Sequence, residues 1–258
     1  MADPRITARR HQALLAVAFL TRLPVARLLP MAPIPLTAAA WAFPLAGLVV
    51  GGAGAAVLAL SAWAGLPPVI GALLAVGVMI RATGALHEDG LADFADGAGG
   101  NSREQRLEIM RDSHIGSYGV LALLIATGLR VAALMSLPPR AALLLVGVAM
   151  ASRAGMVAAM RALPPARTQG LGHAASAPPR GGVAGALALG LGGLGAAGFA
   201  TGQPVAAAGA AVAIAVMQAA TGLRARRMLG GQTGDVLGAI QQLGEIAGLL
   251  ALVLLLNP

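Results

Sequence analysis

The chain has 258 residues, of which 57% are hydrophobic and only 11% are charged, and its mean hydropathy is +0.79. A soluble domain usually has about 25% charged residues, so this composition excludes an ordinary soluble enzyme. Cysteine is absent, which excludes disulfides, thiolate metal sites and cysteine nucleophiles. The net charge is +8, but only 3% of the residues are aromatic, which argues against nucleic acid as a partner.

Residues 6–20 predict an interfacial helix whose Arg side chains remain in water. The apolar run ends at Thr21-Arg22-Leu23-Pro24 without a small-residue cleavage site, so we do not expect cleavage as a signal peptide. Apolar segments long enough to cross a membrane follow, with Pro-rich breaks between them, at about 41–62, 67–86, 116–136, 141–160, 183–201, 204–223 and 236–256.

The predicted fold is therefore all-α, a polytopic transmembrane helical bundle with about seven spans plus the N-terminal interfacial helix, in a single integral membrane domain over residues 1–258. Two GxxxG pairs, Gly47 with Gly51 and Gly181 with Gly185, are expected to let helices approach closely.

The distribution of Arg predicts the orientation of the bundle. With a cytoplasmic N-terminus, the loops at about 87–115, 161–182 and 224–235 are cytoplasmic too. Those loops and the N-terminal segment contain 14 Arg residues, and the opposite face contains Arg140 alone. This asymmetry satisfies the positive-inside rule and predicts a C-terminus on the exterior side.

The acidic residues gather on the same predicted face. Seven of the 10 lie in the 87–115 loop, and Asp235 lies in another loop beside a Gly-rich turn. Such a gathering is typical of an active site at a membrane surface.

Asp89, Asp93 and Asp96 have the spacing i, i+4, i+7, which places them on one stripe of a helix that we expect to continue the second span. At ~6 Å and an effective dielectric constant of ~20, each pair of charges costs about 3 kcal/mol. A divalent cation held by Glu88 and these aspartates would offset the repulsion, and oxygen ligands favour Mg²⁺, with Mn²⁺ as the alternative. The other interpretation is a solvated acidic face neutralised by Arg103, Arg106 and Arg111.

Further polar residues suit phosphate oxygens, because Arg matches phosphate geometry and Gly-rich turns expose backbone amides. They are Arg111, Ser113 and His114 before the third span, the turn that contains Thr233 and Asp235, and two Arg residues inside predicted spans, Arg81 and Arg153. Asp112 in the same segment suits a second metal contact. The bland alternative is that the 111–114 segment is an ordinary loop and that the Gly-rich turn merely joins two helices. Arg130 lies deeper, and its role, structural or functional, stays open.

The sequence resembles the cobalamin synthase family, whose members are adenosylcobinamide-GDP ribazoletransferases. The resemblance runs nearly end to end, and its most specific parts are the acidic stretch 84–100 and the turn Gly231-Gln232-Thr233-Gly234-Asp235. Supporting parts are 19–25, 111–119, Ser152-Arg153 and 167–172. His114 departs from the family, in which Arg is more usual.

The resemblance implies a Mg²⁺-dependent membrane phosphotransferase in the bacterial inner membrane, with its active site facing the cytoplasm. It implies adenosylcobinamide-GDP and α-ribazole or its 5′-phosphate as substrates, GMP as leaving group, and adenosylcobalamin or its phosphate as product. The implied metal ligands are Glu88, Asp89, Asp93 and Asp96. The implied catalytic residues are Asp89, Asp93, Asp96 and Asp112, and the implied substrate-binding residues are Arg81, Arg111, Ser113, His114, Arg153, Arg167, Thr233 and Asp235. The oligomeric state stays open, a homo-oligomer included.

Two other functions remain as alternatives. Asp93-Phe94-Ala95-Asp96-Gly97 is similar to the start of the CDP-alcohol phosphotransferase motif, but Ala98-Gly99-Gly100 breaks its continuation and the second aspartate pair is missing. A cation transporter would usually place its carboxylates near the midplane in repeated halves, whereas these cluster at one face and no repeat is evident.

Overall fold

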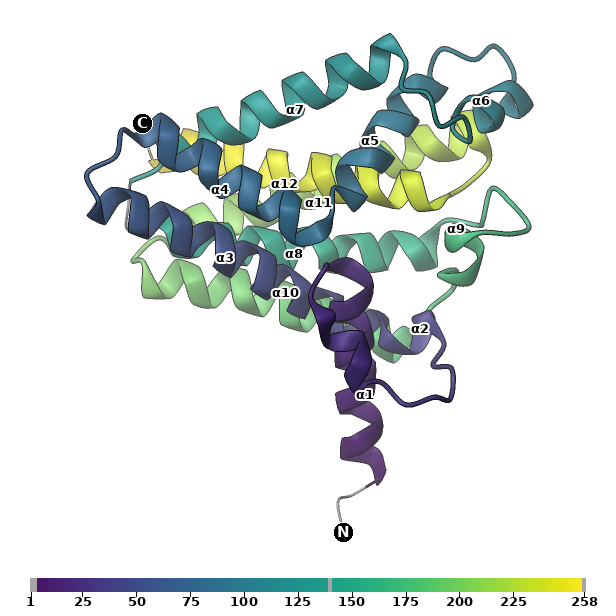
Figure 1. Cartoon of the computed structure of the whole chain (residues 1–258), viewed down its shortest axis with the longest axis horizontal. Helices are drawn as coiled ribbons and strands as arrows, with labels where there is room; N and C mark the ends of the chain where they lie inside the picture. The colour runs from purple at the N-terminus through teal and green to yellow at the C-terminus, as the bar shows by residue number, and fades with distance from the viewer. Residues whose placement is uncertain (1–3, 139–140, 257–258) are drawn as a thin grey trace.

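The computed structural model describes residues 4–138 and 141–256, which form helices joined by short loops (Figure 1). Within these ranges no β-strand is present, and one isolated bridge joins Pro165 to Gln232. The all-α prediction is confirmed. The longer helices are α1 (Pro4–Leu20), α3 (Phe43–Trp63), α4 (Pro68–Thr83), α7 (Ser117–Ser136), α8 (Ala142–Ala162), α10 (Arg180–Ala200), α11 (Pro204–Leu229) and α12 (Gly234–Leu256). The shorter ones are η1 (Pro24–Leu28), α2 (Leu36–Ala39), η2 (Ala40–Ala42), α5 (Leu86–Gly97), α6 (Arg103–Ile109) and α9 (Leu171–Ala174).

Among the described residues, 6 helices are long and apolar enough to cross a membrane: Leu36–Trp63, α7, α8, α10, α11 and α12. The 16-residue α4 joins them only when it is counted with α5, to which it is bent by 90°. The multi-pass prediction is therefore confirmed. Arg140, the single Arg of the opposite face in the charge comparison, lies outside the described residues.

The sequence prediction that α5 simply continues the second span is wrong. Gly84 ends α4 in the left-handed region with φ 66°, and Ala85 follows with φ 60°. Two successive left-handed residues stop the helix and turn the chain by 90°. The bend is covered by the N-terminal region, because the Arg22 amide donates to the carbonyl oxygen of Ala82 (2.7 Å). Because four carboxylates would be costly in lipid, we count the bent pair as one crossing that α4 makes, with α5 outside the membrane-spanning part.

Glycine governs how closely the spans pack. The pair Gly47 and Gly51 lets α3 lie against α8, because a Cβ atom on Gly47 would stand only 2.7 Å from the Cα atom of Met150. This prediction is confirmed. The prediction for Gly181 is wrong, since nothing lies within 4 Å of a Cβ atom there; α10 approaches α8 at Gly190 instead. The central helix of this packing is α8, the most buried of the apolar helices.

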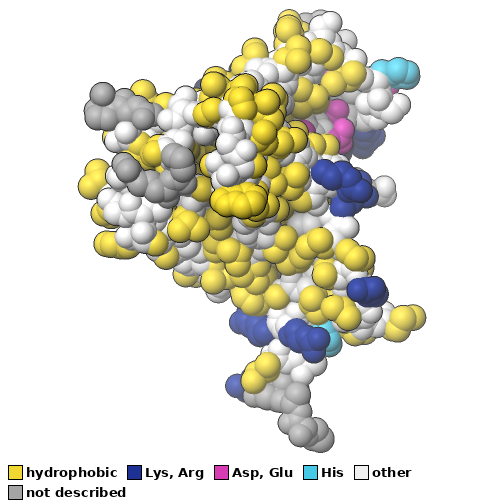
Figure 2. Space-filling view, turned by 60° about the vertical axis from the view of Figure 1, so that its left-hand side comes forward, with side chains coloured by type: hydrophobic (Ala, Val, Ile, Leu, Met, Phe, Trp, Pro, Cys, Tyr) yellow, Lys and Arg dark blue, Asp and Glu magenta, His cyan; other side chains and the backbone are white. Residues whose placement is uncertain are grey.

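The loops and short helices of the predicted site lie at one end of the bundle. In Figure 1 the long helices run side by side, α1 crosses them, and α5, α6 and α9 lie at the end opposite the C-terminus. Figure 2 shows the acidic side chains and some of the basic ones on the right-hand side of the view, further basic side chains at the bottom, and hydrophobic side chains over much of the remaining visible surface. Trp41 fixes α1 by donating to Gln12 (2.8 Å) and by packing its ring 5.1 Å from the guanidinium carbon of Arg9.

Candidate functional site

The site is built where α5 crosses the start of α12. The crossing is close because two glycines face each other's helices. A Cβ atom on Gly90 would stand 2.8 Å from the carbonyl oxygen of Asp235, and one on Gly238 would stand 3.2 Å from the Cα atom of His87. The contact brings the acidic helix of the 84–100 stretch against the Thr-Gly-Asp turn, the two segments that the sequence singles out.

Asp89, Asp93 and Asp235 form a carboxylate cluster at this crossing. Burial, followed by the charges of Asp235, Asp89 and Asp96, raises the pKa of Asp93 to about 6. Asp89 is exposed and Asp93 is half-buried, so both are accessible to a ligand. The repulsion that the helical spacing predicts is therefore present, and it includes Asp235 from a second helix.

Arg103 and Arg106, which the alternative interpretation pairs with this stripe, make other contacts. Arg103 donates to the carbonyl oxygens of Leu229 and Ala166, both at 2.8 Å, and forms an exposed ion pair with Glu104 at 3.7 Å. Arg106 donates to the carbonyl oxygen of Gly100 (2.8 Å). Both Arg residues thus fasten α6 to neighbouring loops.

Asp96 has a structural contact that the sequence does not reveal. Its two carboxylate oxygens accept hydrogen bonds from the amides of Gly116 and Gly119, both at 2.8 Å. Gly116 is the N-cap of α7, so Asp96 satisfies amides at the start of that helix. Because each oxygen of Asp96 already accepts one hydrogen bond, fewer of its lone pairs are free to coordinate a cation.

Glu88 lies on another face of α5 and does not join the aspartates. Its carboxylate accepts hydrogen bonds from Arg130 (2.9 Å) and Gln242 (3.0 Å), and the residue is buried. We therefore correct the predicted metal role of Glu88: it belongs to an ion-pair network inside the bundle.

Sequence reasoning missed Glu245, the centre of that network. Its oxygens lie 3.1 Å from Arg130 and 3.6 Å from Arg153, and the side chain is 1% exposed. A lone acidic residue in an apolar span was the signal that could have found it, because such a residue needs a cationic partner. The network joins α5, α7, α8 and α12.

Arg153 was predicted to contact phosphate, and the structure places it elsewhere. It is 1% exposed, donates to the carbonyl oxygen of Ala149 (2.9 Å) and pairs with Glu245. A guanidinium enclosed in this way cannot reach a soluble substrate. Arg81, by contrast, is exposed in the last turn of α4.

Arg167 and the turn before α12 form the cationic side of the site. Arg167 lies 3.8 Å from Asp235 and donates to the carbonyl oxygen of Leu107 (2.9 Å). Thr233 donates to Asp235 (3.1 Å), and its oxygen accepts from the amide of Val236 (3.2 Å). Gln232 joins the two loops, since its side-chain amide donates to the carbonyl oxygen of Gly172 (3.0 Å).

The 111–114 segment lies in an exposed loop before α7. Asp112 accepts a hydrogen bond from the amide of His114 (3.0 Å), and its carboxylate lies 2.7 Å from the His114 ring. These contacts hold the pKa of Asp112 below its usual value. Burial and, to a smaller extent, the positive charge of Arg111 lower the pKa of Arg167, so Arg111 lies near it, whereas Ser113 is simply exposed. The structure thus brings Arg111 toward the site and leaves Asp112 paired with His114.

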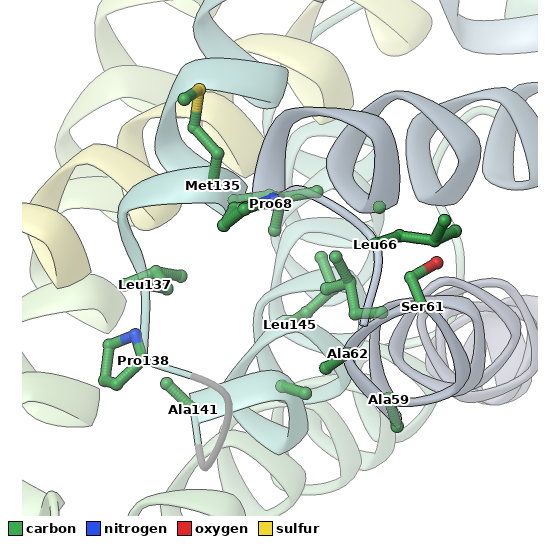
Figure 3. Close-up of a pocket in the computed structure, with 14 residues that line it drawn as sticks. Ala59, Ser61, Ala62, Leu66, Pro68, Met135, Leu137, Pro138, Ala141 and Leu145 are labelled. Atoms are coloured by element: carbon green, nitrogen blue, oxygen red, sulfur yellow. The ribbon is translucent and has the colours of Figure 1, made fainter. Parts of the chain in front are cut away.

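Two small cavities meet at Asp235. One, of about 130 Å³, is lined by Arg167, the 169–173 loop and the 232–235 turn. The other, of about 140 Å³, is mostly apolar and includes Asp89. A larger cavity of about 260 Å³ lies among α3, α4, α7 and α8 at the other end of the bundle; it has no ionisable side chain and does not suit a charged substrate (Figure 3).

The carboxylates do not form a ready-made metal cage. In the part of the chain that the structure describes, no three His, Asp or Glu side chains are close enough to hold a metal ion. Mg²⁺, however, is usually bound by one or two carboxylates together with waters and substrate phosphates. Asp89 and Asp93, with their mutual repulsion and their access to solvent, fit that more open arrangement.

Most of the chain matches a known protein family. Residues 12–253 match the protein family described as cobalamin-5-phosphate synthase. The chain belongs to this family. The match spans the acidic helix, the Arg167 loop and the Thr-Gly-Asp turn, and it favours the cobalamin-5-phosphate synthase family over either alternative class.

Curated relatives in the family cover nearly the whole chain. An adenosylcobinamide-GDP ribazoletransferase of Bradyrhizobium diazoefficiens is 47% identical over 92% of this chain and 90% of its own length. Relatives with the same description from Azorhizobium caulinodans and Allorhizobium ampelinum are 44% and 41% identical, over 96% and 93% of this chain and 99% and 95% of their own lengths. No solved structure matches the chain.

Proposed function

We propose that this chain transfers the corrinoid phosphoryl group of adenosylcobinamide-GDP to α-ribazole or its 5′-phosphate, and that the transfer takes place where α5 crosses α12. A new bond forms between a ribose hydroxyl oxygen of the acceptor and the corrinoid-linked phosphorus. The bond from that phosphorus to the bridging oxygen breaks, and GMP leaves with that oxygen. The hydroxyl proton passes to one carboxylate of the carboxylate cluster at the crossing.

The observation that carries the proposal is the close contact of Gly90 with the backbone of Asp235, because it sets carboxylates and an Arg side by side. Phosphoryl transfer depends mainly on positioning and on neutralising charge. Asp89 and Asp93 would hold Mg²⁺, which would neutralise phosphate charge when bound. Asp96 would assist only through lone pairs left free by its bonds to α7.

The anionic part of the donor would lie on the opposite side of Asp235. Arg167, the 230–235 turn and the cavity of about 130 Å³ between them offer a guanidinium and backbone amides. Arg111 adds a second positive charge in the same region. The amide end of α12 also favours an anion, because the helix dipole is positive there.

The site would face the cytoplasm of a bacterial cell, with the chain in the inner membrane. The support is the concentration of Arg on the loops at the site's end of the bundle, which the positive-inside rule assigns to the cytoplasmic face. Both substrates carry phosphate or ribose and would reach the carboxylates from water.

The experiment is a GMP-release assay with the purified protein, adenosylcobinamide-GDP, α-ribazole and Mg²⁺. Release that needs all three additions supports the proposal. GMP release without α-ribazole would indicate hydrolysis instead, and the absence of release with a folded protein would refute the transferase function.

A further inference from the structure

The apolar cavity beside the carboxylate cluster has features of a built binding site. Its volume is about 140 Å³, close to the ~150 Å³ engineered cavity that binds benzene in another protein. It lies between the N-terminal helices and the α5–α12 crossing, with walls from α1, α2, α3, α5, α8, the 171–175 segment and α12. One small, flat aromatic group matches this space.

The walls of this cavity suit a flat apolar group. Phe19 and Phe43 stack with ring centroids 6.1 Å apart and an angle of 30° between their planes. Met156 and Met160 line another part, and the flexible, polarisable methionine side chain packs well against aromatic rings. The walls therefore offer aromatic and sulfur contacts on more than one side.

One polar side chain in the cavity wall has no partner. His87 is 2% exposed, and within the described residues neither of its ring nitrogens has a hydrogen-bond partner. A buried polar group without a partner costs about 1–3 kcal/mol, so an imidazole in this position is expected to meet a polar atom of a ligand. An acyl chain, which has no such atom, would leave it unsatisfied.

The cavity also adjoins the carboxylates of the proposed reaction site. Asp89 and Asp235 are among its lining residues, and Asp235, Gly234 and Leu171 line the neighbouring cavity of Arg167 as well. A ligand with its ring in the apolar cavity would therefore have its next group at the carboxylates and could extend toward the Arg167 loop.

We propose that this cavity binds the aromatic heterocycle of the acceptor nucleoside, with His87 hydrogen-bonded to a ring nitrogen and the ribose at Asp89 and Asp235. The proposal rests on the proposed function, because it assigns the acceptor end of the same site. It makes His87 and the α1–α3 wall determinants of which base is accepted.

The first test changes the size of the cavity. Ala175 is buried in its wall, and Ala141 is equally buried in the wall of the distant apolar cavity, which makes a matched pair. Ala175→Leu should raise KM for α-ribazole by at least about tenfold and leave KM for adenosylcobinamide-GDP within about twofold. Ala141→Leu should change neither. An unchanged acceptor KM in a folded Ala175→Leu protein would overturn the proposal.

The second test asks about the hydrogen bond. The wild-type protein should prefer benzimidazole riboside to the corresponding indole riboside, which lacks the second ring nitrogen, by roughly 100-fold in kcat/KM. His87→Leu should remove that preference, and His87→Asn should keep part of it. A merely structural His87 would lower both rates equally and keep the ratio. The same ratio in His87→Leu as in wild type would contradict the assignment.

Failure of the proposed function can be told apart from failure of this inference. Equilibrium binding of benzimidazole riboside to the purified protein needs no donor and no turnover. Binding that is present in wild type and Ala141→Leu and is lost in Ala175→Leu supports the cavity even if no GMP is released. Active transfer with equal binding to all three proteins would overturn the cavity and leave the transferase function standing.

Discussion

Gly90 of α5 and Asp235 of α12 touch backbone to backbone: a Cβ atom on Gly90 would stand 2.8 Å from the Asp235 carbonyl oxygen and 2.9 Å from its Cα atom. A side chain at position 90 must push the two helices apart. Since the carboxylates and the Arg167 turn belong to different helices, their alignment depends on this contact.

Gly90→Ala should therefore inactivate the enzyme without unfolding it. A displacement of about 1 Å at a reacting centre can cost roughly 100-fold in rate, and we expect at least that loss in kcat for GMP release. Gly77→Ala is the matched control, because nothing lies within 4 Å of a Cβ atom at Gly77. Equal activity of the two variants would mean that the crossing does not position the site.

The buried ion pairs predict a stability effect. Glu245 faces both Arg130 and Arg153, so Glu245→Leu leaves two guanidinium groups in the bundle with one fewer counter-charge. Removing one partner of a buried pair costs about 3–5 kcal/mol, and thermal unfolding in detergent should show a large fall in Tm. Arg153→Ala should act in the same way. If it stayed as stable as wild type and only raised KM for the donor, the phosphate role predicted from sequence would be right after all.

The carboxylate cluster predicts how pH and Mg²⁺ affect the stability of the folded protein. The pKa of Asp93 is raised from 3.8 to about 6, so between these values the folded protein binds more protons than the unfolded chain. Without a divalent cation this carboxyl therefore makes the folded protein less stable as pH rises through that window. Asp93→Asn should remove this part of the pH dependence and raise Tm at pH 7 in chelator.

Adding Mg²⁺ should reverse the comparison. A cation that binds only the folded state stabilises it by mass action, so Mg²⁺ should raise the Tm of wild type and have little effect on Asp93→Asn. The same Mg²⁺ shift in both proteins would place the cation somewhere other than at Asp93.

The orientation of the bundle can be tested independently. With a cytoplasmic N-terminus and seven crossings, the C-terminus lies outside the cytoplasm. Alkaline phosphatase fused after Pro258 should then be active, and a cytoplasmic reporter at the same position should not. The opposite pattern would mean that the number of crossings is even, and α4, with 16 residues, would be the helix to re-examine.

The sequence predicted the spans from apolar length and the aspartate stripe from helical periodicity. Apolar length marks each crossing, and the spacing of Asp89, Asp93 and Asp96 places them on one side of a helix whatever surrounds it. The same spacing indicates that Glu88 does not share this stripe, because adjacent residues lie about 100° apart around a helix. Glu88 therefore faces Arg130 instead.

Other features could not be read from the chain. Ala85 in the left-handed region follows from the tertiary contact at the α4–α5 bend, because no local signal favours that conformation for alanine. Likewise, a capping role for Asp96 requires knowing that α7 begins beside it. The pairing of Arg153 with Glu245 could have been predicted, however, because Glu245 is the one acidic residue of the last predicted span.

The carboxylates at the α5–α12 crossing, together with a divalent cation, are expected to carry out phosphoryl transfer. The most direct measurement is GMP release from adenosylcobinamide-GDP and α-ribazole by wild type, Asp93→Asn and Glu104→Gln, each with Mg²⁺ and with chelator. Glu104 is the matched acidic control, since it lies on exposed α6 in an ion pair with Arg103, and such pairs contribute only about 0–1 kcal/mol. We predict Mg²⁺-dependent release by wild type and, within about tenfold, by Glu104→Gln, with release by Asp93→Asn reduced at least roughly 1000-fold. Full activity of Asp93→Asn, or of wild type after exhaustive chelation, would contradict the account.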